Sequence, residues 1–164
     1  MLDPEPGAHL LSIDMQPQLV LRTSRRLAGL SQGKAARLAG TAQSALSAYE
    51  NGTKVPTPEV VARILAAEGF HPAMLVDAHR EEIRAIAARN HGERIRLFGS
   101  AARGEDSASS DLDFLVRFAP GASLLDLVDM ADELESLLGV PADVISEAGL
   151  SDRHARVLHE AVDV

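Results

Sequence analysis

Two aspartates one residue apart, Asp111 and Asp113, are the side chains of this sequence with the clearest capacity for chemistry. They open an apolar run, and residues two apart on a strand share a face, so both carboxylates are predicted to point the same way. Carboxylates held that close repel each other unless a cation lies between them, and Mg²⁺ is commonly held by carboxylates together with substrate phosphates. A solvated acidic turn is the alternative for a bare Asp-x-Asp, which is a common pattern. The pair Gly99-Ser100, at the end of the preceding apolar run, favours the metal site.

The segments that must position these residues alternate between strands and helices. Alternation of side chains predicts strands over Arg94 to Phe98, Asp111 to Phe118 and Ala142 to Ser146, the last of which contains Asp143. Helices are predicted over Ala73 to Asn90, from a capping box of Ser123 and Asp126 to Gly139, and over Ser151 to Val162. The apolar residues expected to pack are Leu124, Leu127, Val128, Ala131, Leu134 and Leu138 in the middle helix, and Ala155, Leu158 and Val162 in the last. This order is typical of a small α/β domain, which we expect to contain a mixed sheet.

The first half of the chain has the pattern of short helices instead. Residues 1–16 show no clear periodicity and are predicted to form a loose N-terminal arm, and helical spacing begins at Pro17. Caps and stops divide the segment after Pro17 into four helices; they are Gly29, Ser31, Gly40, Thr41, Gly52 and Thr57-Pro58. Two short helices joined by a glycine turn form a helix-turn-helix, in which Ala36 permits close approach and Leu46 fills the core. We therefore predict an α+β chain of two modules, an all-α helix-turn-helix domain over 17–72 and the α/β domain over 73–164.

Charge divides the chain in the same place. Residues 1–75 contain 7 Lys+Arg against 6 Asp+Glu, whereas residues 76–164 contain 9 against 18. The basic part can meet phosphates, with Arg22, Arg25 and Arg26 expected on the polar face of its first helix, and the acidic part repels nucleic acid unless metal ions intervene. The chain has no cysteine, which excludes disulfides and thiolate metal sites. No apolar stretch approaches the roughly 20 residues that span a bilayer, so we expect a cytoplasmic protein with no membrane partner.

The N-terminal module carries a specific resemblance. The stretch from Gly29-Leu-Ser-Gln through Glu50-Asn-Gly and the following proline resembles the Cro and phage-repressor (Xre-type) DNA-binding family, over roughly Leu19 to Phe70. Such domains place the start of the second helix of the motif in the major groove and bind two half-sites as dimers. The resemblance implies base contacts from Gln43, Ser44, Ser47 and Ala48, and phosphate contacts from Gln32, Arg37, Lys54 and Arg22. Gln43 is the residue able to form a bidentate pair with adenine. A helical protein-binding module is the alternative.

The C-terminal module carries a second resemblance, over about residues 75–164. Leu97-Phe-Gly-Ser-Ala-Ala-Arg-Gly and Ser110-Asp-Leu-Asp-Phe-Leu-Val, followed by Asp143, resemble the minimal nucleotidyltransferase branch of the DNA polymerase beta superfamily. The resemblance implies that Asp111 and Asp113 hold two Mg²⁺ ions bridging the phosphates of ATP, and that Asp143 completes one metal site and helps to activate the attacking hydroxyl. Gly99 and Ser100 would bind the phosphates, and Arg103 would neutralise their charge. The plainer alternatives are an exposed helix-end cation for Arg103 and an acidic strand-edge residue for Asp143.

The two resemblances together imply a function. Proteins similar to the minimal branch serve as antitoxins that pair with HEPN-type ribonuclease toxins and transfer AMP from ATP to a toxin tyrosine. We therefore expect an antitoxin-like protein adenylyltransferase that acts on a partner protein, with a DNA-binding module that binds the operator of its own operon as a homodimer. One alternative is a transcriptional regulator whose second domain binds a nucleotide or a partner without catalysis. Another is a toxin acting on tRNA, which the acidic C-terminal module disfavours.

Overall fold

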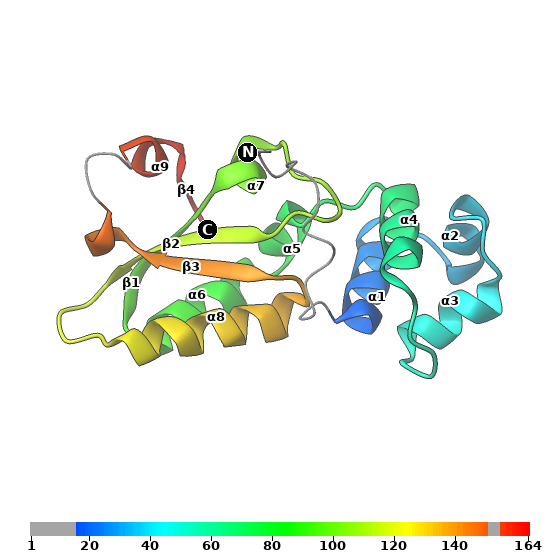
Figure 1. Ribbon diagram of the computed structural model, residues 1–164, viewed down its shortest axis with the longest axis horizontal. Coiled ribbons are helices and arrows are strands. Elements are labelled where there is room, and N and C mark those ends of the chain that lie inside the picture. Colours follow the sequence, from blue (N-terminus) through cyan, green and yellow to red (C-terminus); the bar gives the residue numbers. More distant parts are fainter. Residues whose placement is uncertain (1–15, 151–154) are drawn as a thin grey trace, which may run out of the picture.

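The computed structural model describes residues 16–150 and 155–164. Most of the predicted N-terminal arm, residues 1–15, and the start of the predicted closing helix, residues 151–154, lie outside the described residues. A helical bundle and an α/β domain follow each other along the chain and lie end to end (Figure 1). The fold class is confirmed: an all-α N-terminal part precedes a small α/β domain with a mixed sheet.

The N-terminal bundle consists of α1 (Pro17–Leu27), α2 (Gln32–Leu38), α3 (Gln43–Glu50) and α4 (Pro58–Glu68). Ser31 caps α2, because its side chain accepts a hydrogen bond from the amide of Lys34. The turn between α2 and α3 contains Gly40 at φ 62°, a left-handed conformation that glycine adopts without strain. The predicted cap Thr41 is wrong by one residue: α3 begins after Ala42, without a side-chain cap. Ala36 and Leu46 are buried in the core of the bundle.

The α/β domain is built on a four-stranded sheet in the order β3-β2-β1-β4. Its strands are β1 (Gly92–Phe98), β2 (Leu112–Phe118), β3 (Ala142–Ser146) and β4 (Val162–Asp163). Strand β1 is antiparallel to β2 and β4, and β2 is parallel to β3. The connecting helices are α5 (Ala73–Ala78), α6 (Arg80–Arg89), α7 (Gly99–Arg103), α8 (Leu124–Leu138), the 3₁₀ turn η1 (Glu147–Gly149) and α9 (Ala155–Glu160).

One face of this sheet is covered by helices and carries the core. Helices α6 and α8 lie side by side against that face, whereas α9 lies on the opposite side (Figure 1). Leu97, Phe114 and Val116 point into the core beneath α6 and α8 and are buried. Because side chains alternate along a strand, their neighbours Phe98, Asp113 and Leu115 belong to the other face. That second face is where the acidic residues lie.

Three details of the predicted elements are wrong. The helix expected over 73–90 is two helices, because His79 leaves the helical conformation at φ −118°, ψ 25°. In α8 the predicted capping box and the stop at Gly139 are present, but Leu124 and Val128 are 75% and 45% exposed. A helix turns about 100° per residue, so Val128, two residues before Met130, points away from the buried row of Met130, Leu134 and Leu138. Leu124 is the first residue of α8 and lies at the N-terminal end of the helix.

The end of the chain also differs from the prediction. Helix α9 stops at Glu160, and Val162–Asp163 form β4, which pairs with Leu97 and Arg96 of β1. Leu158 and Val162, expected to pack as parts of one helix, are 39% and 47% exposed. The open edge of β1 offers unpaired backbone groups, and pairing with them outweighs continuation of a short helix. Within the described residues, no helix is both long and apolar enough to cross a membrane.

Candidate functional site

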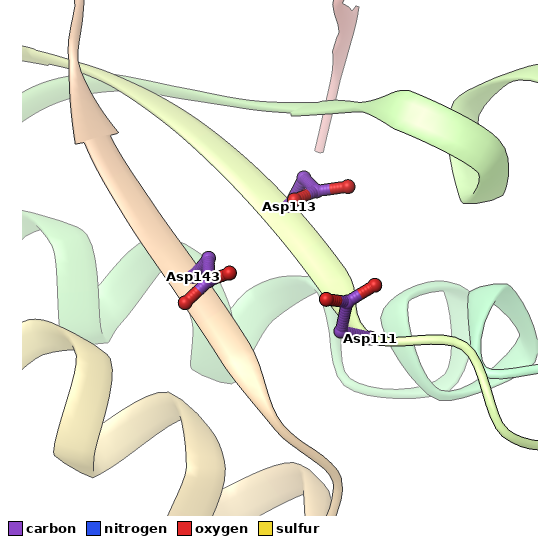
Figure 2. A group of neighbouring side chains, drawn as sticks. All are labelled: Asp111, Asp113 and Asp143. Atoms are coloured by element: carbon purple, nitrogen blue, oxygen red, sulfur yellow. The ribbon is translucent and has the colours of Figure 1, made fainter. Parts of the chain in front are cut away.

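Asp111, Asp113 and Asp143 converge at one end of the sheet. Asp113 of β2 lies opposite Asp143 of β3 in the parallel register, so both side chains stand on the face not covered by α6 and α8. Asp111 directly precedes β2. Each of the three residues contributes a carboxylate oxygen, and these oxygens lie within 4.8 Å of one another. Figure 2 shows the three carboxylates around a common space.

Gly99 makes room for this cluster. Strand β1 ends at Phe98, which pairs with Asp113, and Gly99 begins α7 with φ 73°. A Cβ atom built on Gly99 would overlap Oδ2 of Asp113. A side chain at this position would therefore both strain the backbone and displace a carboxylate of the cluster. Ser100 follows in the first turn of α7, beside the same strand ends.

The cluster is electrostatically strained in the absence of a cation. Burial, and then the charges of Asp111 and Asp143, raise the pKa of Asp113 to about 6, and Arg103 opposes this only in part. A divalent ion among the three carboxylates would remove this repulsion. Three carboxylate oxygens at these distances, next to a glycine that leaves the space open, fit a hard divalent cation such as Mg²⁺.

Arg103 lies at the end of α7 and is held by two acidic side chains. Its Nε donates to Glu105 at 2.7 Å, and its Nη1 donates to Glu160 of α9 at 2.9 Å. Glu160 also pairs with Arg156. Arg103 is thus near enough to lower the pKa of Asp113, but its guanidinium is shared with an acidic residue from the C-terminal helix. Glu160 was not expected from the sequence, because no local pattern links it to α7.

The residues predicted to contact DNA lie on or beside α3. Gln43 and Ser44 are exposed in its first turn, and Ser47 and Ala48 are half-buried one turn later. Arg37 in α2 and Lys54 in the loop after α3 are exposed. Gln32 is placed differently from the expectation, because its side-chain amide donates to Glu50 at 2.9 Å. Gly33 leaves space for the side chain of Gln43, whose Oε1 would lie 3.2 Å from a Cβ at that position.

A buried ion pair in the bundle was missed from the sequence. Arg25 donates to both carboxylate oxygens of Glu50, at 2.6 and 2.9 Å, and the Glu50 side chain is only 2% exposed. Together with Gln32, this pair ties α1 and α2 to the end of α3. The hydrogen bond to Glu50 raises the pKa of Arg25. Burial by itself would raise the pKa of Glu50, but the hydrogen bonds from Arg25 and Gln32 outweigh it and lower that pKa. Arg25 is therefore not one of the free surface cations that helical spacing had predicted.

Comparison with known protein families divides the chain into the same two kinds of module. The helix-turn-helix domain family matches residues 19–78, and the nucleotidyltransferase domain family matches residues 79–162. The second match covers about half of the chain and contains the whole carboxylate cluster. The chain belongs to the nucleotidyltransferase family. The two matches meet between α5 and α6, and the boundary at residues 72 and 73 stays a prediction.

Similar proteins cover the second module. A Methanocaldococcus jannaschii protein named as a candidate protein adenylyltransferase is 40% identical over 92 residues, which are 56% of this chain and 99% of that protein. The protein adenylyltransferase MntA of Thermococcus cleftensis is 37% identical over 91 residues, 55% of this chain and 89% of that protein. A solved structure of a candidate minimal nucleotidyltransferase is 44% identical, covers 56% of this chain and 95% of its own, and has a TM-score of 0.52. The minimal nucleotidyltransferase fold predicted from the sequence is confirmed.

Proposed function

We propose that this chain is a Mg²⁺-dependent protein adenylyltransferase that transfers AMP from ATP to a hydroxyl group, a tyrosine, of a partner protein. The observation that carries the proposal is the convergence of Asp111, Asp113 and Asp143 beside the Gly99-Ser100 turn. The names of the M. jannaschii and T. cleftensis relatives support a protein as the acceptor. The resemblance to antitoxins supports a HEPN-type toxin as the partner.

The reaction is a displacement at the α-phosphorus of ATP. The acceptor oxygen forms a bond to that phosphorus, the bond to the bridging oxygen of the β-phosphate breaks, and pyrophosphate leaves. When bound, two Mg²⁺ ions supply charge stabilisation to the entering and leaving oxygens. Asp111 and Asp113 would hold both ions, and Asp143 would complete one site.

The remaining steps belong to the side chains and backbone of the chain. Asp143 is exposed at the edge strand β3, where it can take the proton of the acceptor hydroxyl. The amides at the start of α7 and the hydroxyl of Ser100 would donate hydrogen bonds to the phosphates, next to the Asp113 carboxylate for which Gly99 leaves room. Arg103 neutralises phosphate charge after exchanging a carboxylate partner, Glu105 or Glu160, for the nucleotide.

The N-terminal module would bind operator DNA. The match to the helix-turn-helix family and the exposure of Gln43, Ser44, Arg37 and Lys54 support DNA binding. A homodimer would place two α3 helices in successive major grooves, about one helical turn apart. We propose that the protein acts in the cytoplasm, where it could bind operator DNA.

Labelling tests the enzymatic part directly. The purified chain is incubated with ATP labelled in the α-phosphate, with Mg²⁺, and with the protein encoded by the neighbouring gene. The partner should become labelled, the double variant Asp111→Ala, Asp113→Ala should not label it, and the exposed-acid control Asp129→Asn should behave like the parent. If the double variant neutralises the partner as well as the parent does, partner binding suffices, and the chain is a regulator with a non-catalytic domain.

A further inference from the structure

The segment that links α4 to α5, called the linker below, is bonded to the loop that leads into the metal cluster. Asp106, in the loop between α7 and β2, is only 6% exposed. Its Oδ2 accepts a hydrogen bond of 2.9 Å from the amide of Ala73, the first residue of α5. Its backbone carbonyl accepts one of 2.7 Å from Nδ1 of His71, which lies in the linker after α4. The carboxylate also lies 3.9 Å from the same ring nitrogen.

A hydrogen-bonded turn connects Asp106 to Asp111. After Asp106 the chain makes a turn that is closed twice, since the amide of Ser110 donates to the carbonyl of Ser107 and the amide of Ser107 donates to Oγ of Ser110, each at 2.9 Å. Asp111 follows this turn directly. Few backbone torsions remain free between the anchored Asp106 and the carboxylate of Asp111, so the anchor restricts where that carboxylate can lie.

A second contact joins the N-terminal module to the other metal-bearing strand. The amide of Gln16 donates to the carbonyl of Gly139 at 3.0 Å, and a Cβ on Gly139 would meet side-chain atoms of Leu19 and Val20 at 3.0–3.1 Å. Gly139 lies in the turn from α8 to β3, four residues before Asp143. This turn is also bonded to β2, because the amide of Leu112 donates to the carbonyl of Pro141 at 3.0 Å.

We propose that Asp106 is a positioning residue for the transfer site, and that through it the linker from the helix-turn-helix domain sets the geometry of the loop carrying Asp111. The proposal deepens the function proposed above and rests on it. The contact partners at 71 and 73 lie outside the region matched by the nucleotidyltransferase family, residues 79–162.

Variants of Asp106 and His71 in the full chain test the proposal with two readouts that need no acceptor protein. The first is the affinity for Mn²⁺, titrated as the metal alone; the second is hydrogen exchange of the amides of residues 107–111 without metal. Asp106→Ala should weaken Mn²⁺ binding by about tenfold, as expected for a residue that orients metal ligands, and should speed exchange in the loop. Asp106→Asn retains an oxygen for the Ala73 amide and should restore both. His71→Ala should give a smaller change of the same sign.

The controls separate this proposal from the proposed function. Asp129→Ala removes an exposed acid of α8 and should change neither readout. If Asp106→Ala does not fold, His71→Ala and Asp106→Asn still test the positioning role of Asp106. The positioning role would be overturned if His71→Ala and Asp106→Ala both kept the Mn²⁺ affinity and the loop exchange of the parent. It would also be overturned if Asp106→Asn failed to restore these two properties. If instead the double variant Asp111→Ala, Asp113→Ala binds Mn²⁺ like the parent, the proposed metal site fails, while loop exchange still reports on Asp106.

Discussion

Replacing Asp113 by asparagine is expected to make the metal-free protein more stable while it abolishes function. A pKa raised from 3.8 to about 6 means that ionised Asp113 costs the folded state up to about 3 kcal/mol, at about 1.4 kcal/mol for each factor of ten in proton affinity. Because the side chain is only half-buried, solvent screening lowers this cost to about 2 kcal/mol. Below pH 3.8 the carboxyl is protonated in both the folded and the unfolded chain, so the cost is absent there. Stability is therefore lost as the pH rises from about 4 through about 6, and the full cost applies above that range.

Denaturant unfolding with a chelator at about pH 8 and at about pH 4 measures this effect. Circular dichroism is the suitable probe, because the chain has no tryptophan and its single tyrosine, Tyr49, lies in the other module. Asp113→Asn should raise the free energy of unfolding by about 2 kcal/mol at the higher pH and by little at the lower one. Asp129→Asn, an exposed control, should change it by less than about 0.5 kcal/mol. Saturating Mg²⁺ should stabilise the parent and not the variant. Equal or lower stability of Asp113→Asn at pH 8 would refute the assignment of repulsion to this cluster.

Four other measurements test the metal cluster, the buried ion pair and the DNA-binding helix. Mn²⁺ affinity should fall as the pH is lowered through about 6, where Asp113 takes up a proton; calorimetric titration across this range would show a flat profile if the carboxyl is not a ligand. Gly99→Ala should lose metal binding and about 1–2 kcal/mol of stability, from its positive φ and its overlap with Asp113. Arg25→Ala should cost about 3–5 kcal/mol, because it leaves Glu50 buried without its partner; thermal unfolding would expose a smaller loss. Gln43→Ala should relax DNA sequence preference more than it lowers nonspecific binding, and binding should weaken steeply with salt; equal loss on all DNA sequences would contradict base reading by this side chain.

Several elements of the fold could be predicted because their causes are local. The capping box of Ser123 and Asp126 and the left-handed stop at Gly139 bound α8 as expected, since a cap involves only neighbouring residues. The buried row Leu112, Phe114 and Val116 follows from the alternation of side chains along a strand. The same alternation explains why Asp113 stands on the opposite face from that row.

Other features depend on residues far apart in the chain. Strand β4 forms because β1 has a free edge, and no pattern within Val162–Asp163 distinguishes it from the end of a helix. The kink at His79 separates α5 from α6, although the apolar spacing runs through both. The pairing of Arg25 with Glu50 and of Arg103 with Glu160 joins residues 25 and 57 positions apart, which no local period encodes.

Residue type and short-range periodicity are enough to predict which residues would bind a metal and a nucleotide, and which helices would bind DNA. How these parts meet depends on the folded chain. The parallel register of β2 and β3 brings Asp143 to Asp113, and the bonds of Asp106 to the linker connect the cluster to the DNA-binding module. Register and packing arise from the burial of the whole core and from the satisfaction of backbone groups by distant partners, so they are properties of the folded chain and not of any one segment.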